Sequence, residues 1–225
     1  GMLLGQQEFE KLSRSAVDCL VELHQLELVQ SGLIQLGKPE GFTQRQVTGW
    51  VERYFRAKTK EIPELENAAI WLQENIPSTE YTAFIHNDFK YDNLVLDPAD
   101  PCSIRSVLDW EMATIGNPLM DLGTSLAYWA EEKDPEILKL FNLSHLPGNL
   151  TREELMDYYF SKAAGSKEEM IFYYVFGLFK VAVIAQQIFK RYSLGHSTDA
   201  RFAQLIYVVE AAGKKAIQTL QTNQF

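Results

Sequence analysis

Cysteine and positive charge are both scarce in this chain. Its 225 residues include only two cysteines, Cys19 and Cys102, and neither stands at a spacing typical of metal ligands. That count favours a reducing, cytoplasmic setting in which both thiols are structural. The 21 Lys and Arg are outnumbered by 30 Asp and Glu, which gives a net charge of −9. Because nucleic acids and anionic membranes are themselves negatively charged, this excess argues against either as a partner.

Phosphate-binding glycine loops are missing, and long apolar runs are missing with one exception. Gly37 and Gly41 share a loop, but no Gly-Lys-Ser/Thr follows them, so they do not form a phosphate loop of that type. The exception is "MIFYYVFGLFKVAVIAQQIF" (170–189), which is about the length that crosses a bilayer. Lys180 stands at its middle, and a lysine at the bilayer centre costs about 2.5–3.5 kcal/mol. We therefore expect a buried core helix and no membrane span.

What the sequence does contain is the pattern of a mainly helical, soluble globular protein with short strands in its middle. Apolar residues at helical spacing predict helices over about 6–24, 63–76, 119–131, 135–142, 151–163, 167–192 and 198–221, and a further helix that "TQRQ" (43–46) opens as a capping box. Runs of β-branched and aliphatic residues predict strands at 82–85, 94–97 and 104–110, the first two forming a small antiparallel element. His24 lies on an apolar helix face, which favours a structural histidine. The predicted fold class is α+β, mainly helical.

The polar octet "HNDFKYDN" (86–93) lies between the first two predicted strands. His86, Asp88 and Asn93 have the H-x-D-x-x-x-x-N spacing of the protein-kinase catalytic loop, and Asp109 follows at the end of the third strand. Phosphoryl transfer needs a carboxylate near the attacking hydroxyl and oxygen ligands for Mg²⁺. Asp88 suits the first role, and Asn93 and Asp109 suit the second. Lys90 is placed to donate to the transferring phosphate.

Two other interpretations of the octet remain open at this stage. A short Asx-rich turn tolerates these residues without any function. A metal hydrolase with His86, Asp88, Asp92 and Asp109 around its metals is a third possibility, although Asn93 and Lys90 suit such a cluster poorly. The presence of "VLDWE" on a following strand and of "GNPLMDL" (116–122) after it favours the phosphotransferase interpretation.

The stretches "IHNDFKYDNLVLD" and "VLDWEMATIGNPLMDLG" resemble the aminoglycoside phosphotransferase family, most closely the branch of kinase-like domains related to those fused to acyl-CoA dehydrogenases. "LVELHQLELVQSGL" and "GKPEGFTQRQVTGWVERY" agree with the segments before the catalytic loop in that branch, so the resemblance covers about residues 3–210. It implies a protein-kinase-like fold, ATP as phosphoryl donor, Mg²⁺, and a small-molecule hydroxyl acceptor. The implied roles are catalytic base for Asp88, Mg²⁺ ligand for Asn93 and Asp109, loop anchor for His86, a second acid near the metal for Glu111, and brace of the catalytic loop for Asp121.

Departures from the family pattern narrow these implications. Asn87 replaces the arginine of the protein-kinase H-R-D, and Trp110-Glu111 replace Phe-Gly, which favours a small-molecule acceptor over a protein. Asn117 stands where the family usually has Asp. Tyr128, Trp129, Tyr158, Tyr159 and Tyr173 are candidates to line an acceptor pocket, although aromatic residues at helical spacing more often belong to the core.

The resemblance also predicts the domain organisation. The chain opens with a segment like the one just after the kinase hinge, so residues 1–225 are expected to be a C-terminal lobe without its β-rich N-lobe: helices at about 6–76, the catalytic loop and strands at about 82–112, and a helical subdomain at about 119–221. We expect ATP to bind only with an N-lobe, which either has been cut from this chain or is supplied by a separate polypeptide, and we expect the uncovered surface to favour self-association. The alternative is an inert kinase-like remnant that acts as an interaction module.

Overall fold

The structure, a computed structural model, describes residues 4–140 and 142–225. Its helices are α1 (Gln6–His24), α2 (Phe42–Ala57), α3 (Pro63–Glu74), α4 (Pro118–Tyr128), α5 (Glu136–Lys139), α6 (Arg152–Phe160), α7 (Met170–Ser193) and α8 (Leu205–Thr222). Short 3₁₀ turns include η2 (Tyr91–Asn93), η3 (Trp110–Met112) and η5 (Ala200–Gln204). The mainly helical α+β prediction is confirmed. The last helix begins later than predicted because the 3₁₀ turn η5 takes up its first residues.

Four short strands form two separate antiparallel ribbons. β1 (Ala83–Ile85) pairs with β4 (Thr114–Gly116), and β2 (Leu94–Leu96) pairs with β3 (Ile104–Val107). The prediction that the two strands around the octet form one β-element was therefore wrong, since β1 and β2 belong to different ribbons. The predicted third strand also ends at Val107, because Asp109 adopts a left-handed backbone with φ 63° that extended pairing does not allow.

The start of α2 also differs from the prediction. The helix begins at Phe42, after Gly41 in a left-handed conformation, and the Thr43 side chain does not cap it. Instead the Glu80 carboxylate accepts hydrogen bonds from the backbone N–H groups of Gly41 (3.0 Å) and Thr43 (3.2 Å). An acid that satisfies free N–H groups at a helix start is stabilising, and here it comes from a residue distant in sequence.

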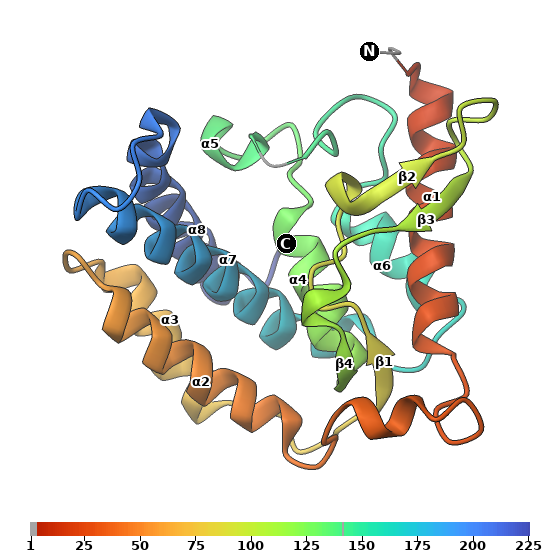
Figure 1. The fold of residues 1–225 in the computed structure, drawn as a ribbon, viewed down its shortest axis with the longest axis horizontal. Helices are drawn as coiled ribbons and strands as arrows, with labels where there is room; N and C mark the ends of the chain where they lie inside the picture. Colours follow the sequence, from red (N-terminus) through yellow and green to blue (C-terminus); the bar gives the residue numbers. More distant parts are fainter. Residues whose placement is uncertain (1–3, 141) are drawn as a thin grey trace.

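Helix α7 is the centre of the helical core. It packs against α2, α3, α4 and α8, and Figure 1 shows these helices side by side, with α1 and the β2–β3 ribbon on the other side of the molecule. Within the described residues, one stretch, Lys167–Ser193, is long and apolar enough to cross a membrane, and 78% of its most apolar window is buried inside the protein. Residues 170–189 are therefore a core helix, as predicted.

Two glycines allow α4 and α7 to pack closely. A Cβ atom on Gly123 would lie 2.2 Å from the carbonyl oxygen of Tyr173, and one on Gly177 would lie 2.2 Å from the carbonyl oxygen of Gly123. No side chain fits at either distance. The crossing of the two helices is thus set by direct backbone contact.

Candidate active site

The octet forms a loop whose first residue is anchored from both sides. The backbone N–H of His86 donates to Oδ2 of Asp121 (2.7 Å), and the N–H of Asn87 donates to Oδ1 of the same carboxylate (2.8 Å). His86 Nε2 lies 2.8 Å from the carbonyl oxygen of Leu108, and its Nδ1 accepts from the N–H of Asp88 (3.2 Å). These two contacts require a proton on Nε2. His86 and Asp121 therefore hold the loop through these hydrogen bonds.

Asp121 is itself held by a buried histidine. His24 Nε2 lies 3.2 Å from Asp121 Oδ2, and the Tyr159 hydroxyl lies 2.8 Å from His24 Nδ1. Burial acts to raise the pKa of Asp121, but the hydrogen bond and charge of His24, together with the His86 N–H, outweigh it and lower that pKa. The brace is therefore a carboxylate, and His24 has the structural role that its helix face indicated.

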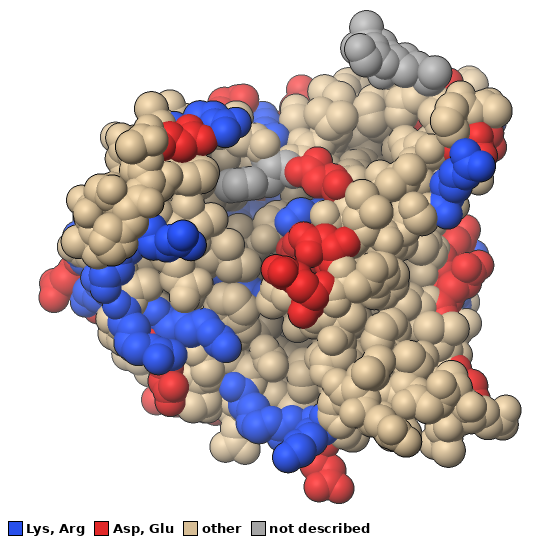
Figure 2. All heavy atoms as spheres, in the orientation of Figure 1, with Lys and Arg blue, Asp and Glu red and all other residues tan. Residues whose placement is uncertain are grey.

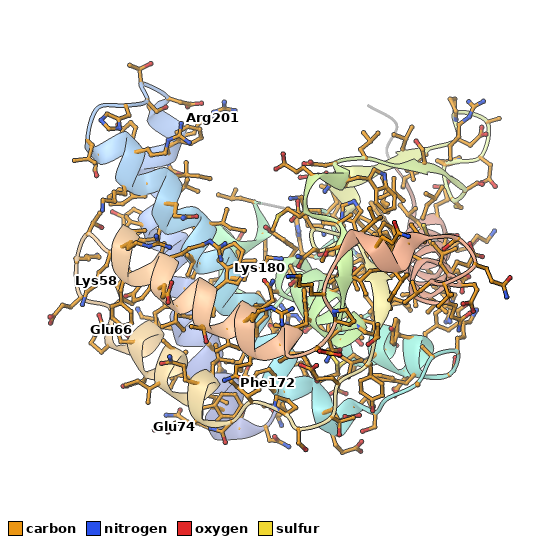
Figure 3. All side chains as sticks on the ribbon, turned by 60° about the horizontal axis from the view of Figure 1, so that its bottom comes forward. Lys58, Glu66, Glu74, Phe172, Lys180 and Arg201 are labelled. Atoms are coloured by element: carbon orange, nitrogen blue, oxygen red, sulfur yellow. The ribbon has the colours of Figure 1, made fainter. Side chains whose placement is uncertain are left out.

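Asn87 receives a buried ammonium that the sequence did not assign to the site. Lys180 of α7 is fully buried, and its Nζ donates to the backbone oxygen of Asn87 (2.5 Å) and to its side-chain Oδ1 (2.7 Å). Figure 3 shows Lys180 in the middle of α7, the helix against which α2 packs. Burial lowers the pKa of Lys180 to about 8, and the carboxylates of Asp121 and Asp88 oppose this shift. Asn87 itself has φ 70°, a left-handed conformation that Asn tolerates better than most residues.

The Asp88 side chain is surrounded by donors. Lys90 Nζ lies 2.7 Å from Asp88 Oδ2, and Asn93 Nδ2 donates to the backbone oxygen (2.8 Å) and to Oδ2 (3.2 Å) of Asp88. Tyr128 of α4 hydrogen-bonds the same carboxylate, and burial together with the Asp88 charge raises the pKa of its hydroxyl. Lys90 also lies over the Tyr128 ring, 4.7 Å from its centre. The carboxylate is therefore fixed in direction but still 14% exposed.

Leu108 connects the octet to Asp109. Its N–H donates to the backbone oxygen of Asn93 (2.7 Å), while its carbonyl oxygen faces His86 Nε2. Asn93 and Asp109, which the sequence predicted as metal ligands, therefore lie on chain segments that are bonded to each other. Glu111 follows on the exposed turn η3, where the neighbouring Trp110 stacks on Phe84 with ring centres 5.8 Å apart.

The side chains that face this region suit Mg²⁺. Among residues 4–140 and 142–225, the hydrogen bonds of the Asn93 side chain are made by Nδ2 and not by Oδ1, and Asp109 is exposed. Carbonyl and carboxylate oxygens are the ligands that Mg²⁺ prefers. In contrast, no three His, Cys, Asp or Glu side chains within residues 4–140 and 142–225 come together as a metal-holding group. The four-residue cluster that a metal hydrolase needs is not formed.

The candidate aromatic pocket residues separate into two groups. Trp129, Tyr159 and Tyr173 are buried in the core, and Tyr158 packs at the α1–α6 side, where its hydroxyl contacts Asp18. Tyr128 is the member of the set that contacts Asp88. The expectation of core positions thus holds for most of them.

A hollow of about 360 Å³ opens beside the loop. It is lined by Asn87, Met112 and Thr114 on one side and on the other by α2 and the segment before it, with Lys38, Phe42, Arg45, Gln46, Trp50 and Arg53. Figure 2 shows the face of the molecule hollowed near its centre, with Lys and Arg side chains on one side and a group of Asp and Glu side chains opposite them.

Comparison with known proteins places this geometry in a family. The profile of the phosphotransferase enzyme family (APH) matches residues 3–155, which include both α2 and the whole catalytic loop. The chain belongs to this phosphotransferase family. Acyl-CoA dehydrogenase family member 11 of Rattus norvegicus is 32% identical over 189 residues, which are 82% of this chain and 24% of that protein. The chain thus spans about a quarter of the length of this curated relative.

Solved structures with the same fold include other members of this type. A protein described as an aminoglycoside phosphotransferase from Ralstonia eutropha JMP134 has a TM-score of 0.82 and 25% identity, and the match covers 96% of this chain and 67% of that chain. Choline kinase from Cryptosporidium parvum Iowa II has a TM-score of 0.59 and 14% identity, with 96% and 66% of the two chains covered. The protein-kinase-like fold of this family member is therefore shown.

Lys180 is the main residue of the candidate site that sequence reasoning missed in this family member. Its position in the middle of an apolar helix was used only as evidence against a membrane span. A buried ammonium needs acceptors, so its presence in a core helix was also a signal for a nearby polar group. The sequence alone did not show that this group is the backbone of the catalytic loop.

Proposed function

We propose that this chain supplies the catalytic base and the metal-binding side chains of an ATP-dependent phosphotransferase that acts on a hydroxyl of a small molecule. The observation that carries the proposal is the Asp88 carboxylate, which is fixed by Lys90 and Asn93 and remains open to solvent. Family membership supports the reaction class. The connection of Asn93 to Leu108, next to Asp109, supports a metal site beside the base.

In this proposal Asp88 orients the acceptor hydroxyl and takes its proton as the oxygen attacks the terminal phosphorus of ATP, while the bond from that phosphorus to the bridging oxygen breaks and ADP leaves. Lys90 stands beside Asp88 and donates to the transferring phosphoryl group, which carries negative charge in the transition state. Asn93 holds the Asp88 side chain through Nδ2. Tyr128 keeps its proton, because its pKa is raised, and therefore acts as a fixed donor to Asp88.

Asn93 and Asp109 would hold Mg²⁺, and Glu111 is near enough in sequence to contribute a further carboxylate. The ion, when bound, neutralises charge on the ATP phosphates. Because the chain itself offers so few ligands, we expect weak binding of Mg²⁺ in the absence of nucleotide. We propose a small-molecule acceptor because Asn87 stands where protein kinases have the arginine that binds a phosphorylated activation segment. Asn87 is shorter than arginine, its side chain is bound by Lys180, and its N–H is bound by Asp121.

The test compares Asp88→Asn with the unchanged protein, each with an N-lobe of the family supplied by fusion or as a separate chain. We expect turnover of ATP with a hydroxylated acceptor to fall by about 10³-fold or more, while Mg²⁺–nucleotide affinity changes little, because Asn keeps the shape and loses the base. Asp109→Asn should weaken Mg²⁺–nucleotide binding as well. Equal turnover by Asp88→Asn and its parent would contradict the assignment and favour an inert interaction module.

A further inference from the structure

The hollow beside the catalytic loop has an unusual charge for this protein. Lys38, Arg45 and Arg53 all line it, whereas the chain as a whole has a net charge of −9. All three side chains are exposed, and none forms an ion pair with a carboxylate of the described residues. Single unpaired cations are common on protein surfaces. Three of them around one concave site next to a catalytic loop form a local positive field.

Contacts of the two arginines leave part of each guanidinium available. Arg45 donates to the backbone oxygens of Glu40 and Lys38, so its position is fixed by the segment before α2. Arg53 lies over the Trp50 ring, 4.8 Å from its centre, which orients the planar group without using its N–H donors. A guanidinium held in this way has donors arranged to bind a carboxylate or phosphate in two places.

A further positive charge lies beneath the hollow. Lys180 binds Asn87, one of the residues that line the hollow, and is close enough to Arg53 for the two charges to repel and lower the pKa of Lys180. The carboxylates that act on the Lys180 charge are Asp121, which is fully buried, and Asp88, which is paired with Lys90. The three cations that line the hollow therefore favour an anion beside Asn87, the residue directly before Asp88.

We propose that the acceptor of this enzyme carries an anionic group, a phosphate or a carboxylate, which Lys38, Arg45 and Arg53 bind while its hydroxyl lies at Asp88. The proposal rests on the function proposed above and specifies its substrate class. A hollow of about 360 Å³ is at the lower end of sites that bind small molecules. The choline kinase with a similar fold is named for a cationic acceptor, and a cation is repelled by this set of residues.

The nucleotide phosphates are the competing ligand for these cations. Our proposed metal ligands, Asn93 and Asp109, border the β2–β3 ribbon, since Asn93 directly precedes β2 and Asp109 follows the end of β3, where the exposed Leu108 also lies. The lining of the hollow includes none of these residues. We therefore assign the ribbon side to the nucleotide and the α2 side to the acceptor.

The test measures binding of four small probes to the whole chain by ¹H–¹⁵N NMR titration at low salt: glycerol 3-phosphate, glycerate, glycerol and choline. We expect the two anions to bind and to shift signals of α2 and the loop, with affinity that falls as salt is added, whereas glycerol and choline do not bind there. The order of the first two distinguishes a phosphate from a carboxylate acceptor.

Three variants locate the site. Arg53→Gln should weaken binding of the preferred anion about tenfold, because a charged donor is lost. Arg45→Gln should also weaken binding of the anion about tenfold. Because Arg45 also fixes the segment before α2, the decisive variant is Arg53→Gln, since Arg53 packs on the Trp50 ring. Arg56→Gln is the matched control on the same helix, since Arg56 is exposed and does not line the hollow. The affinity of Arg56→Gln for the preferred anion should equal that of the parent.

Binding of choline as strong as that of the anions, or an unchanged affinity in Arg53→Gln, would overturn the proposal. With an N-lobe supplied, displacement of the anion by Mg²⁺–ADP together with a loss of Mg²⁺–ADP affinity in Arg53→Gln would also overturn it, because the cations would then bind the nucleotide. Asp88→Asn should still bind the anion. Since the readout is binding, a failure of Asp88→Asn to reduce turnover contradicts the proposed reaction and not this site.

Discussion

The ammonium of Lys180 donates to both oxygens of Asn87, one on the backbone and one on the side chain. Asn87 directly precedes Asp88, and its left-handed backbone sets the direction in which the next side chain leaves the loop. Because the Asp121 carboxylate accepts from the N–H of the same residue, Asn87 is bound from two helices, α4 and α7. The direction of the proposed base is thus determined by two buried charges of opposite sign.

Lys180→Met should impair turnover without removing the base. The loss of both hydrogen bonds leaves the Asn87 oxygens without their donor and allows Asp88 to shift, and misplacement of a reacting group by about 1 Å can cost 10²-fold. We expect kcat, measured with an N-lobe supplied, to fall between about tenfold and a hundredfold. Mg²⁺–nucleotide affinity should remain close to that of the parent. A kcat equal to the parent's would show that Lys180 does not position the loop.

The stability of the protein should depend on Lys180 in alkaline solution. Its pKa is lowered to about 8 in the folded state, whereas an unfolded lysine has a pKa of about 10.4. Between these values the unfolded chain binds the proton and the folded chain does not, so this residue adds stability as pH rises from about 8 to about 10. The free energy of unfolding of the parent minus that of Lys180→Met should therefore increase with pH in that interval, as measured by urea unfolding. Lys214→Met, at an exposed position on α8, is the matched control and should show a constant difference.

Two buried carboxylates offer a comparison between positioning and stability. Asp121 holds the catalytic loop, whereas Asp134 is paired with Arg152 and with Lys215 (3.2 Å) at α6 and α8. Removal of one partner from a buried charged network typically costs 3–5 kcal/mol, so Asp121→Asn and Asp134→Asn should each lower the free energy of unfolding by about 3 kcal/mol. Turnover per folded molecule should fall only in Asp121→Asn, because an amide cannot accept from both loop N–H groups. Equal loss of turnover in both variants would contradict a specific role for Asp121.

The glycine contact between α4 and α7 predicts a strong effect of a single methyl group. Gly177→Ala would place a Cβ atom 2.2 Å from the carbonyl oxygen of Gly123, and the helices must separate to accept it. We expect a loss of about 2 kcal/mol or more in the free energy of unfolding, measured by thermal or urea unfolding. Gly49→Ala is the control within a helix, because its Cβ atom meets only the flexible end of Arg53 (3.2 Å). It should be neutral or stabilise the protein by up to about 1 kcal/mol.

The sequence predicted the loop at 86–93 better than the elements around it. The spacing of His86, Asp88 and Asn93 is local, and the residues that follow one another in a short loop must lie together in space. The brace Asp121 was found through resemblance, and the structure shows its carboxylate on the two loop N–H groups. The role of α7 as a core helix was also predicted, since its apolar residues leave few other possibilities.

Features that depend on distant contacts were predicted poorly. The capping box proposed at Thr43 does not form, because the helix begins one residue earlier, at Phe42, and the Thr43 N–H donates to Glu80 from a separate segment. β4 has three residues, one of them Gly116, so it carries too little pattern to be recognised, and the pairing of β1 was consequently misassigned. Periodicity showed that Lys180 is on a buried helix, but it did not show which neighbour the ammonium meets.

The pairing of the strands has a mechanical consequence for the site. The chain leaves the β1–β4 ribbon through the octet to enter β2, and it returns from β3 through Asp109 and η3 to enter β4. Both segments that carry the proposed base and metal ligands are therefore the two crossings between the same pair of ribbons. They are fastened to each other at Leu108, whose N–H and carbonyl oxygen bond Asn93 and His86. Because Leu108 joins the two crossings, a movement of one ribbon against the other would strain both crossings at once, so the spacing of the proposed base and metal ligands depends on the relative position of the two ribbons.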